Sequence, residues 1–539
     1  MTKKLAIIIL IVCALAVACK NRKRRNVTGL WKPGQTEPFR DRSINKANAY
    51  NDIFLDSNDV EAFIVSEKLN DTLSEAVREF YDARNYEFAW FASTGLIEQA
   101  YSFHSLYRTD NNNNAFDKSL EKQLDRIRLE RDTTINSKEK GIIKTELQIT
   151  RKFIEYAIEN NLCADVSPAN LATYIPAKKY PANDLADSML AVNDDNKRYE
   201  SLSSAYRLLK VQLKKYYDIT KRGGWQPITG DAKKYTVGMT APAIVLIKKR
   251  LQATGELPGA DTSAVFTPEL ENAVKTYQVN HGEAATGVVN AAWIANMNVS
   301  AAARMQLILI NMQRMRWMPS QPEGKLIIVN IPEFELYVDS AKTHLFHMAV
   351  VVGAEGHNTT MFSGKMNQIV FSPYWDIPPS IVKKEILPAI SKDKHYLDKK
   401  DMEITGNEGG LPVIRQRPGE KNALGRVKFL FPNSFNIYLH DSPEKALFSR
   451  SERNLSHGCI RLSDPVKMAH YLLAGSKTWP PEKIDSAMDS GVEQTARLKP
   501  TVPVVITYYT AWVDENGALH FVDDIYGHDK NMAAKMFTK

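Results

Sequence analysis

Apolar residues recur at helical spacing through the N-terminal half of the sequence, with polar residues between them. Two runs show apolar or aromatic residues three, four or seven positions apart: Ile143, Leu147, Ile154 and Ile158, then Leu202, Tyr206, Leu209 and Leu213. Such spacing puts these side chains on one face of an α-helix. We therefore predict a helical domain over residues 49–225, in which no residues point to catalysis.

A compact unit of three short helices is predicted over residues 230–300. Pro242 and Pro268 each stand where a first helical turn would begin, and Thr267 can cap the second helix. Apolar residues follow both prolines at helical spacing, and Gly287 lies in the turn segment predicted after the second helix.

Beyond this unit the pattern changes from helical to β. Residues 301–322 are predicted as a connecting helix, because a Met- and Leu-rich run ends just before Pro319. Short runs of β-branched and aromatic residues bounded by turns are typical of strands. The expected strands are 326–331, 335–338, 348–353, 436–441, 502–509 and 518–522. The last two are predicted to form a hairpin around a turn at 514–517.

Residues 375–415 interrupt the β pattern. Four prolines, at positions 378, 379, 388 and 412, and many lysines lie between strand-like segments. Because proline cannot donate a hydrogen bond to a neighbouring strand, we predict an insertion here rather than part of the sheet. The predicted fold class is α+β and multidomain, with a mainly β domain over residues 323–530.

The N-terminus has the pattern of an export signal. Basic residues precede an uninterrupted apolar run of 14 residues, Leu5–Ala18, which is shorter than the ~20 residues that span a bilayer. A signal peptide is therefore predicted over residues 1–18. Ala16–Ala18 followed by Cys19 resembles a bacterial lipobox, so we predict lipidation of Cys19 and a tether over residues 19–48. An ordinary secretory signal and an uncleaved anchor are the alternatives.

Composition and charge narrow the class of partner. The 539 residues are 44% hydrophobic, enough for several cores, and the formal net charge of +8 falls to about +6 when Lys3 and Lys4 leave with the signal. A mild positive excess suits an anionic polymer. Zinc-finger spacing and interleaved aromatic and basic residues are both missing from the sequence, which argues against nucleic acid. No metal site and no cofactor are predicted.

The cysteines carry the clearest chemical signal. Cleavage before Cys19 leaves only Cys163 and Cys459 as further thiols, so no conventional disulfide framework is expected, and Cys163 has no predicted role. Cys459 stands in the segment Ser456-His457-Gly458-Cys459-Ile460-Arg461. A thiol is a poor nucleophile until an imidazole takes its proton or, as imidazolium, lowers its pKa.

His440 is the candidate partner of Cys459. It lies 19 residues upstream, in the predicted strand 436–441. We therefore predict that Cys459 is a nucleophile and that His440 is its base. His457 could orient the loop instead of reacting. Gly458 has no Cβ, so backbone amides around it can approach a substrate carbonyl and stabilise an oxyanion.

At these residues the sequence resembles the L,D-transpeptidase family, the YkuD-domain enzymes, and most closely their YcbB-like branch. The family signature is a His followed by Ser/Thr-His-Gly-Cys, which His440 and Ser456–Cys459 match. The resemblance covers at least residues 305–530 and includes three further segments: Tyr374–Ile381, Gln416–Phe429 and Tyr438–Pro443.

Two other segments resemble the accessory domains of this branch. Phe80–Tyr86 with Ala89-Trp90 is similar to its scaffold segment, although such an aromatic stripe is also typical of a core. Phe266–Gln278 followed by Gly287 is similar to a three-helix peptidoglycan-binding domain, with a plain helical spacer as the alternative.

The resemblance implies a reaction and roles for further residues. Cys459 would attack the bond before the terminal D-Ala of a tetrapeptide stem, forming a thioester, and an amine of a second stem would then form a 3→3 cross-link. The backbone carbonyl of Asp441 would orient His440, with the Asp441 carboxylate as an added possibility. Arg461 is a candidate either for a substrate carboxylate or for a structural ion pair. Asn422 and Tyr438 are further candidates for substrate binding.

The resemblance also implies a capping subdomain, partners and a cellular location, and it leaves alternative functions open. Residues 375–415 would form a capping subdomain over the cysteine, and substrate contacts near Thr359 stay open, because the family often has Thr-Pro there. The expected partners are peptidoglycan stem peptides and glycan, with the membrane reached through the lipid. The expected location is the bacterial envelope, as a periplasmic membrane-anchored lipoprotein. L,D-carboxypeptidase activity, anchoring of a protein to the wall, and non-catalytic wall binding remain alternatives.

Overall fold

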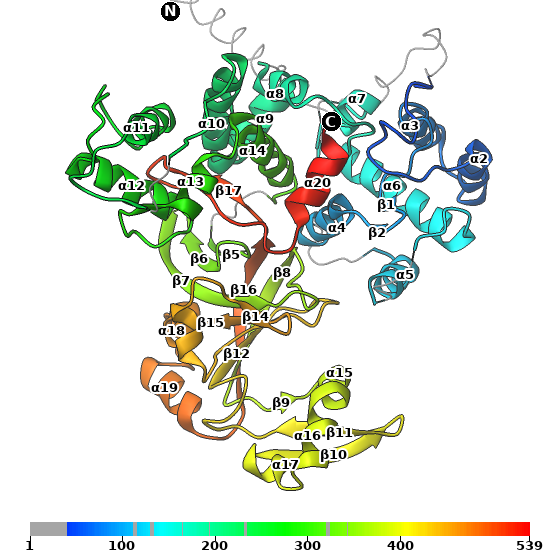
Figure 1. Cartoon of the computed structure of the whole chain (residues 1–539). Helices are drawn as coiled ribbons and strands as arrows, with labels where there is room; N and C mark the ends of the chain where they lie inside the picture. Colours follow the sequence, from blue (N-terminus) through cyan, green and yellow to red (C-terminus); the bar gives the residue numbers. More distant parts are fainter. Residues whose placement is uncertain are drawn as a thin grey trace, which may run out of the picture.

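The computed structural model describes residues 40–110, 116–129, 134–163, 165–192, 194–230, 234–319, 324–341 and 343–538. The predicted signal peptide, the lipidation site Cys19 and most of the predicted tether lie outside these residues. The helical domains, drawn in blue, cyan and green, lie at one end of the molecule, and the β domain extends away from them (Figure 1).

Nine helices form the helical domain within the described residues. They are α2 (Ser57–Ser66), α3 (Asp71–Asp82), α4 (Glu98–Asp110), α5 (Lys118–Leu129), α6 (Lys140–Glu159), α7 (Pro168–Leu171), α8 (Ala182–Leu190), α9 (Asp194–Leu202) and α10 (Ser204–Lys221). The first predicted run lies on α6. The second divides, because the Ser203 hydroxyl accepts from the Tyr206 amide and starts α10 after Leu202. A two-stranded hairpin, β1 (Phe91–Ala92) and β2 (Gly95–Leu96), precedes α4.

The core of the helical domain draws on distant parts of the chain. Its buried cluster includes residues from α14 (Ala301–Met315), β17 (Ala511–Val513), β18 (Leu519–Phe521) and α20 (His528–Met536). The predicted connecting helix is therefore part of this core, and residues 511–521 depart from the predicted domain 323–530 to join it. Apolar burial is the dominant favourable term in folding, so these segments stabilise the domain together.

The predicted C-terminal hairpin is wrong in its first strand. The turn at 514–517 joins β17 to β18, whereas residues 502–507 belong to the long strand β16 (Gln494–Thr507) of the main sheet. A break of three residues, between Thr507 and Ala511, separates the two strands and redirects the chain.

The predicted three-helix unit is present. Its helices are α11 (Pro242–Thr254), α12 (Pro268–Asn280) and α13 (Ala291–Met297), and β3 (Lys234–Tyr235) pairs with β4 (Val289–Asn290). A separate buried cluster around Trp293 holds the helices together. The caps are those expected: Thr267 caps α12, and both prolines occupy first-turn positions.

The β domain is built on a closed sheet. Its strands are β5 (Lys325–Asn330), β6 (Glu335–Ser340), β7 (Thr343–Gly353), β8 (Phe362–Phe371), β12 (Val427–Leu430), β13 (Leu439–His440), β14 (Asn454–Ser456), β15 (Ile460–Leu462) and β16. The order is β14-β7-β15-β13-β12-β8-β16-β5-β6, and β6 also pairs with β7. This last pairing closes eight strands into a ring, which removes the exposed edges of an open sheet. The helices α18 (Pro465–Leu473) and α19 (Pro481–Asp489) pack against the same core.

Residues 375–415 form a separate subdomain at the end of the molecule far from the helical domains (Figure 1). It comprises β9 (Trp375–Asp376), α15 (Pro379–Ile381), η2 (Val382–Ile386), α16 (Leu387–Lys392), α17 (Tyr396–Lys399), β10 (Met402–Glu408) and β11 (Leu411–Gln416). The predicted insertion is therefore present, but the expectation that it contains no sheet is wrong. Its three strands form a small sheet over a buried cluster of their own.

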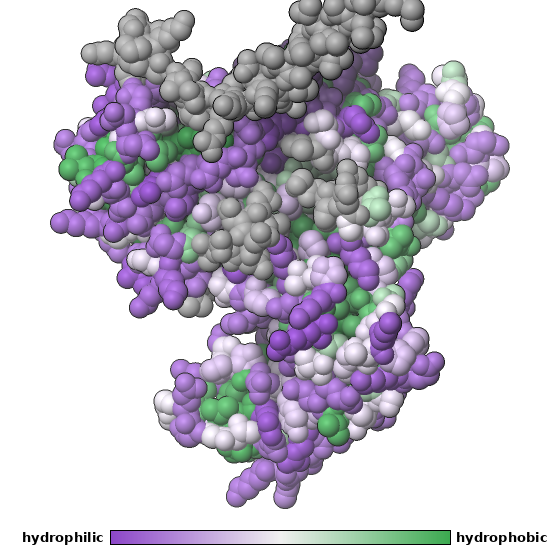
Figure 2. Space-filling view, turned by 180° about the vertical axis from the view of Figure 1, so that it is seen from behind, coloured by the Kyte–Doolittle hydropathy of each residue, from purple (hydrophilic) through white to green (hydrophobic). Residues whose placement is uncertain are grey.

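The surface seen from behind is largely hydrophilic, and apolar side chains gather only in small areas (Figure 2). Among the described residues, no helix combines the length and the apolar character needed to cross a bilayer.

Candidate active site

Two short parallel strands bring Cys459 and His440 to one face of the sheet. Leu439 pairs with Ile460, and His440 pairs with Arg461. Leu439 and Ile460 are both fully buried in the core of the β domain. Because successive side chains of a strand point to opposite faces, Cys459, His440 and Arg461 lie on the other face.

The strand that carries His440 is shorter than predicted. Residues 436–441 were expected to be extended, but only Leu439 and His440 are in β13, and Asn436 has a positive φ of 55°. The Asn433 carboxamide accepts hydrogen bonds from two amides, of Phe435 and Ile437. This local turn competes with the strand and delays its start to Leu439.

His440 is held as a neutral base. Its Nδ1 lies 2.5 Å from the backbone oxygen of Asp441, so Nδ1 donates and Nε2 keeps its lone pair. Burial, reinforced by the charge of Arg461, lowers the pKa of His440 to about 4. Near neutral pH the ring is therefore uncharged and able to accept a proton.

Cys459 is held as a neutral thiol. Burial raises the pKa of the thiol, although hydrogen bonding with Tyr438 and the charge of Arg461 lower it in part. Its Sγ donates to the Asn436 carbonyl at 3.6 Å, and among the described residues no hydrogen bond joins it to His440. Of the two modes of activation left open by the sequence, proton transfer to His440 fits a neutral thiol and a neutral imidazole. The missing Cys459–His440 hydrogen bond is compatible with this role, because catalytic hydrogen bonds often tighten only when substrate binds.

The loop before Cys459 is held by its own hydroxyl. The Ser456 hydroxyl donates to the Cys459 carbonyl at 2.5 Å and accepts from the Gly458 amide at 3.1 Å. Gly458 has φ of +113°, a conformation that favours glycine. Contrary to the expectation for consecutive loop amides, the Gly458 amide is thus occupied. The Thr359 hydroxyl, which is buried, donates to the Gly458 carbonyl and braces the loop from the other side.

His457 points away from the base and toward the insertion. Its Nε2 lies 2.9 Å from a carboxylate oxygen of Glu385, on η2, and both side chains are about half exposed. His457 therefore links the cysteine loop to the subdomain 375–415.

Asp441 orients His440 through its backbone and uses its carboxylate elsewhere. One carboxylate oxygen accepts from the Ser442 amide at 2.7 Å and from the Lys445 ammonium at 2.6 Å. The other accepts from the Arg426 amide at 2.9 Å. A Cβ on Gly425 would come within 2.4 Å of that oxygen, so glycine is required for the approach. The carboxylate therefore fixes the neighbouring turn.

The other predicted substrate-binding residues have structural partners. Arg461 forms an ion pair with Glu444, although its Nε has no hydrogen-bond partner. The buried Asn422 carboxamide donates to the carbonyls of Pro373 and Arg417, both at 2.9 Å, and so closes the base of the insertion. Tyr438 stands beside Cys459, and burial together with that thiol raises the pKa of Tyr438.

A cavity of about 660 Å³ opens onto Cys459 between the β domain and the helical domain. From the β domain it is lined by His457, Gly458, Asn358 and the loop around Asn436. From the helical domain the lining includes Arg128, at the end of α5. Arg128 carries no recognisable signal in the sequence, because it belongs to an ordinary amphipathic helix and reaches the site only through the domain arrangement.

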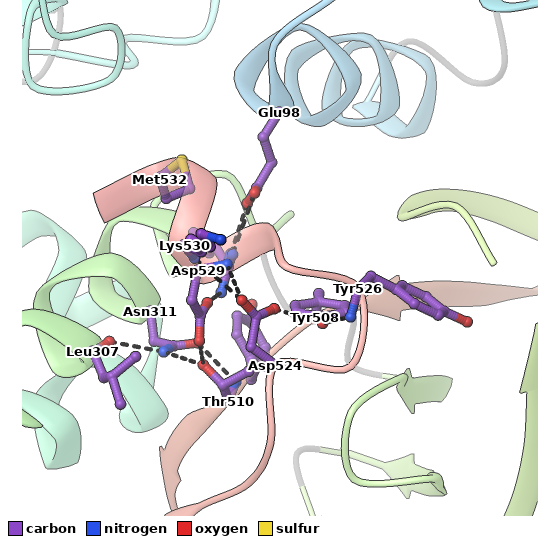
Figure 3. A network of polar contacts seen from close by, with 12 residues as sticks. Glu98, Leu307, Asn311, Tyr508, Thr510, Asp524, Tyr526, Asp529, Lys530 and Met532 are labelled. Atoms are coloured by element: carbon purple, nitrogen blue, oxygen red, sulfur yellow. Dashed lines mark hydrogen bonds and ion pairs between the residues drawn. The ribbon is translucent and has the colours of Figure 1, made fainter. Parts of the chain in front are cut away.

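A polar network anchors the C-terminal segment near the site (Figure 3). The Arg314 guanidinium contacts Glu98 at 2.7 Å and Asp529 at 2.5 Å. Asp524 accepts from the Tyr508 hydroxyl at 2.8 Å, and the Tyr508 hydroxyl in turn accepts from the Tyr526 amide. These contacts join α4, α14 and α20 to the strand β16 that enters the sheet.

Three family models match successive parts of the chain. Residues 75–213 match the "Scaffold domain", residues 240–297 the "Putative peptidoglycan binding domain", and residues 324–484 the "L,D-transpeptidase catalytic domain". The last range contains both His440 and Cys459. The chain carries a YkuD-type L,D-transpeptidase catalytic domain.

One relative is named after the same activity as the matched catalytic domain. A protein of Haemophilus influenzae named "Putative L,D-transpeptidase" is 31% identical in an alignment of 243 residues that covers 42% of this chain and 49% of the relative. The chain thus spans about half the length of the curated relative that it matches.

Solved L,D-transpeptidases resemble the chain only weakly. One from Mycobacterium smegmatis is 14% identical with a TM-score of 0.19, over 34% of this chain and 58% of that one. One from Stackebrandtia nassauensis is 15% identical with a TM-score of 0.19, over 45% and 91%. TM-scores this low do not establish a shared fold, so the family assignment rests on the domain match.

Proposed function

We propose that the protein is a peptidoglycan L,D-transpeptidase that forms 3→3 cross-links through a thioester on Cys459. The observation that carries the proposal is the parallel pairing of β13 with β15, inside the range that matches the catalytic domain. This pairing sets a thiol and a neutral imidazole on one face, beside a cavity of about 660 Å³.

In the first half-reaction, His440 Nε2 takes the Cys459 proton while the sulfur attacks the carbonyl carbon of the third stem residue. The Cys459 amide is the proposed donor to the resulting oxyanion, since Ser456 occupies the Gly458 amide. The tetrahedral species collapses with cleavage of the C–N bond. His440 returns its proton to the leaving D-Ala amine, and a thioester remains.

In the second half-reaction, a side-chain amine of another stem attacks the thioester carbonyl. His440 removes a proton from that amine and returns one to the sulfur, so that the cross-link forms and the free thiol is restored. The buried His440 ring has a pKa of about 4 and thus begins each half-reaction in its basic form.

The test is incubation of the purified protein with defined tetrapeptide stems, followed by mass spectrometry of the products. A dimer with loss of D-Ala supports transpeptidation, and its loss in Cys459→Ala and His440→Ala supports the two roles. His457→Ala should retain thioester formation, because His457 faces Glu385. A hydrolysed tripeptide alone would favour carboxypeptidase activity, and coupling only to a protein amine would favour wall anchoring. Substantial cross-linking by Cys459→Ala would refute the nucleophile.

We also propose that residues 230–300 hold the protein on peptidoglycan and that a lipid on Cys19 holds it at an envelope membrane. Support comes from the match of residues 240–297 and from the lipobox-like Ala16–Ala18. Deleting the three-helix unit should weaken sedimentation with sacculi but spare turnover of small stems. Because the His281 ring packs against Phe521, with ring centroids 5.6 Å apart, a thermal melt must show that the deletion leaves the rest folded. Cys19→Ser should release the protein from membranes.

A further inference from the structure

Arg128 of the helical domain presents an unused donor to the cavity that contains Cys459. Its side chain is only 7% exposed, and no described residue pairs with its Nε. Its other contacts are long, at 3.4 Å to both the Asp125 carboxylate and the Ser434 hydroxyl. A buried guanidinium with an unpaired N–H is unfavourable unless a partner arrives from solution.

The loop beneath Arg128 leads directly to the thiol. The Arg128 guanidinium lies 5.1 Å from the Phe435 ring centroid, and the next residue, Asn436, accepts the hydrogen bond from Cys459 Sγ. The cationic donor and the nucleophile therefore contact adjacent residues of one loop, Phe435 and Asn436.

A second unpaired polar atom lies in the same cavity. The Asn358 side-chain oxygen is buried and has no hydrogen-bond partner. A donor and an acceptor that both lack partners fit a peptide, which offers a carboxylate to the first and an N–H to the second. Burial also lowers the pKa of Arg128, and the nearby Tyr101, Glu121 and Asp125 only partly oppose this.

We propose that Arg128 binds the terminal carboxylate of the donor stem peptide, so that the helical domain supplies part of the substrate site. Because the ligand is taken from the function proposed above, this inference rests on that function. The terminal residue follows the scissile bond, so its carboxylate lies within one residue, roughly 3.5 Å of chain, of the attacked carbonyl. A planar guanidinium can hold such a carboxylate through two parallel hydrogen bonds.

The first experiment compares tetrapeptide stems with a free terminal carboxylate and with a terminal amide. Arg128→Gln should lower kcat/KM for the acid about tenfold or more, mainly through KM, and leave the amide nearly unchanged. Arg126→Gln on the same helix is the matched control, since Arg126 is 52% exposed and pairs with Glu139. Arg128→Lys keeps the charge and should restore part of the preference for the acid. Equal losses on both substrates would overturn the proposal and leave Arg128 a packing residue.

The second experiment does not depend on transpeptidation. Iodoacetate and iodoacetamide alkylate thiols and differ in charge, and the rate at Cys459 is measured by mass spectrometry of its peptide. Arg128→Gln should lower the iodoacetate-to-iodoacetamide rate ratio by about threefold or more, whereas Arg126→Gln should not. An unchanged ratio would contradict the proposal even if the wild type turned over no stem peptide. Failure of turnover alongside a lowered ratio would reject the proposed function and keep the anion site.

Discussion

The Tyr526 hydroxyl donates to the Gly353 carbonyl, at 2.5 Å. The same hydroxyl accepts from the Thr359 amide at 3.4 Å, and the Thr359 side chain holds the Gly458 carbonyl. Tyr526 comes from the C-terminal segment in Figure 3, which follows the hairpin β17–β18. A residue that follows the last strand in sequence thus braces the loop before Cys459.

This link predicts that Tyr526→Phe lowers kcat by about two- to tenfold, because one hydrogen bond contributes about 0.5–1.5 kcal/mol. The measurement is thioester formation on a defined stem, with a thermal melt beside it. Tyr217→Phe is the control, since its hydroxyl donates to Asp187 within the helical domain. An unchanged rate in Tyr526→Phe would show that the brace does not position the loop.

Gly425 is predicted to be intolerant of a side chain. Its φ is +61°, and a Cβ would meet the Asp441 carboxylate at 2.4 Å, so Gly425→Ala should destabilise the fold by about 1–3 kcal/mol. Chemical denaturation gives the free energy of unfolding. Gly406→Ala serves for comparison, because φ there is not positive and no atom lies within 4 Å of the added Cβ. Equal stability of the two variants would argue against a tight Gly425–Asp441 contact.

The pH dependence should report a neutral catalytic histidine. With the pKa of His440 lowered to about 4, the base is available above that pH and is lost as pH falls through it. The acid limb of kcat/KM is therefore expected near pH 4 rather than near 6.5. A profile measured from pH 3.5 to 8 tests this, and an acid limb near 6.5 would mean that the ring is solvated or paired with a thiolate.

The same lowered pKa predicts a stability effect. Between the folded value of about 4 and the ordinary value of 6.5, the unfolded chain binds a proton at His440 that the folded chain does not. Stability should accordingly decrease as pH falls through this window, and His440→Gln should flatten that part of the curve. A parallel curve in the variant would place the titration elsewhere.

The buried Arg314 network should be costly to break. Arg314 is 5% exposed and neutralises Glu98 and Asp529, which are 10% and 6% exposed. Arg314→Met leaves two buried carboxylates without a cation and should lower the free energy of unfolding by about 3–5 kcal/mol. Arg78→Met, in a pair 36% and 52% exposed, should lower it by less than about 1 kcal/mol. Similar losses in both variants would exclude the special role of the network.

Local patterns explain which parts of the site were predictable from sequence. Cys459 and His440 stand in short segments whose spacing is chemically informative, but the parallel pairing of Leu439 with Ile460, which brings these segments together, was not predicted. The direction of the Asp441 carboxylate was not predictable, because it depends on Gly425, Arg426 and Lys445 packing around it.

Other features depended on contacts between distant segments. The small sheet in the insertion was not predicted, because Pro412 argued against a strand there. The proline is tolerated because β11 has only β10 as a neighbour at that position. The strand β9 pairs with β11 only at Arg415 and Gln416. The strand β17 has the same apolar pattern as a barrel strand, so sequence could not tell which core it joins. Arg128 becomes notable only when α5 is set beside the cysteine loop.

The position of the C-terminal segment determines which domain can complete its core first. Residues 511–521 and α20 fill the core of a domain that begins before α2, so that core stays open until they have been synthesised and, if the export signal is used, translocated. The three-helix unit has a separate buried cluster and can close earlier. The core of the helical domain is therefore completed last, although its helices are synthesised first, and until then the apolar faces of α4 and α6 stay exposed.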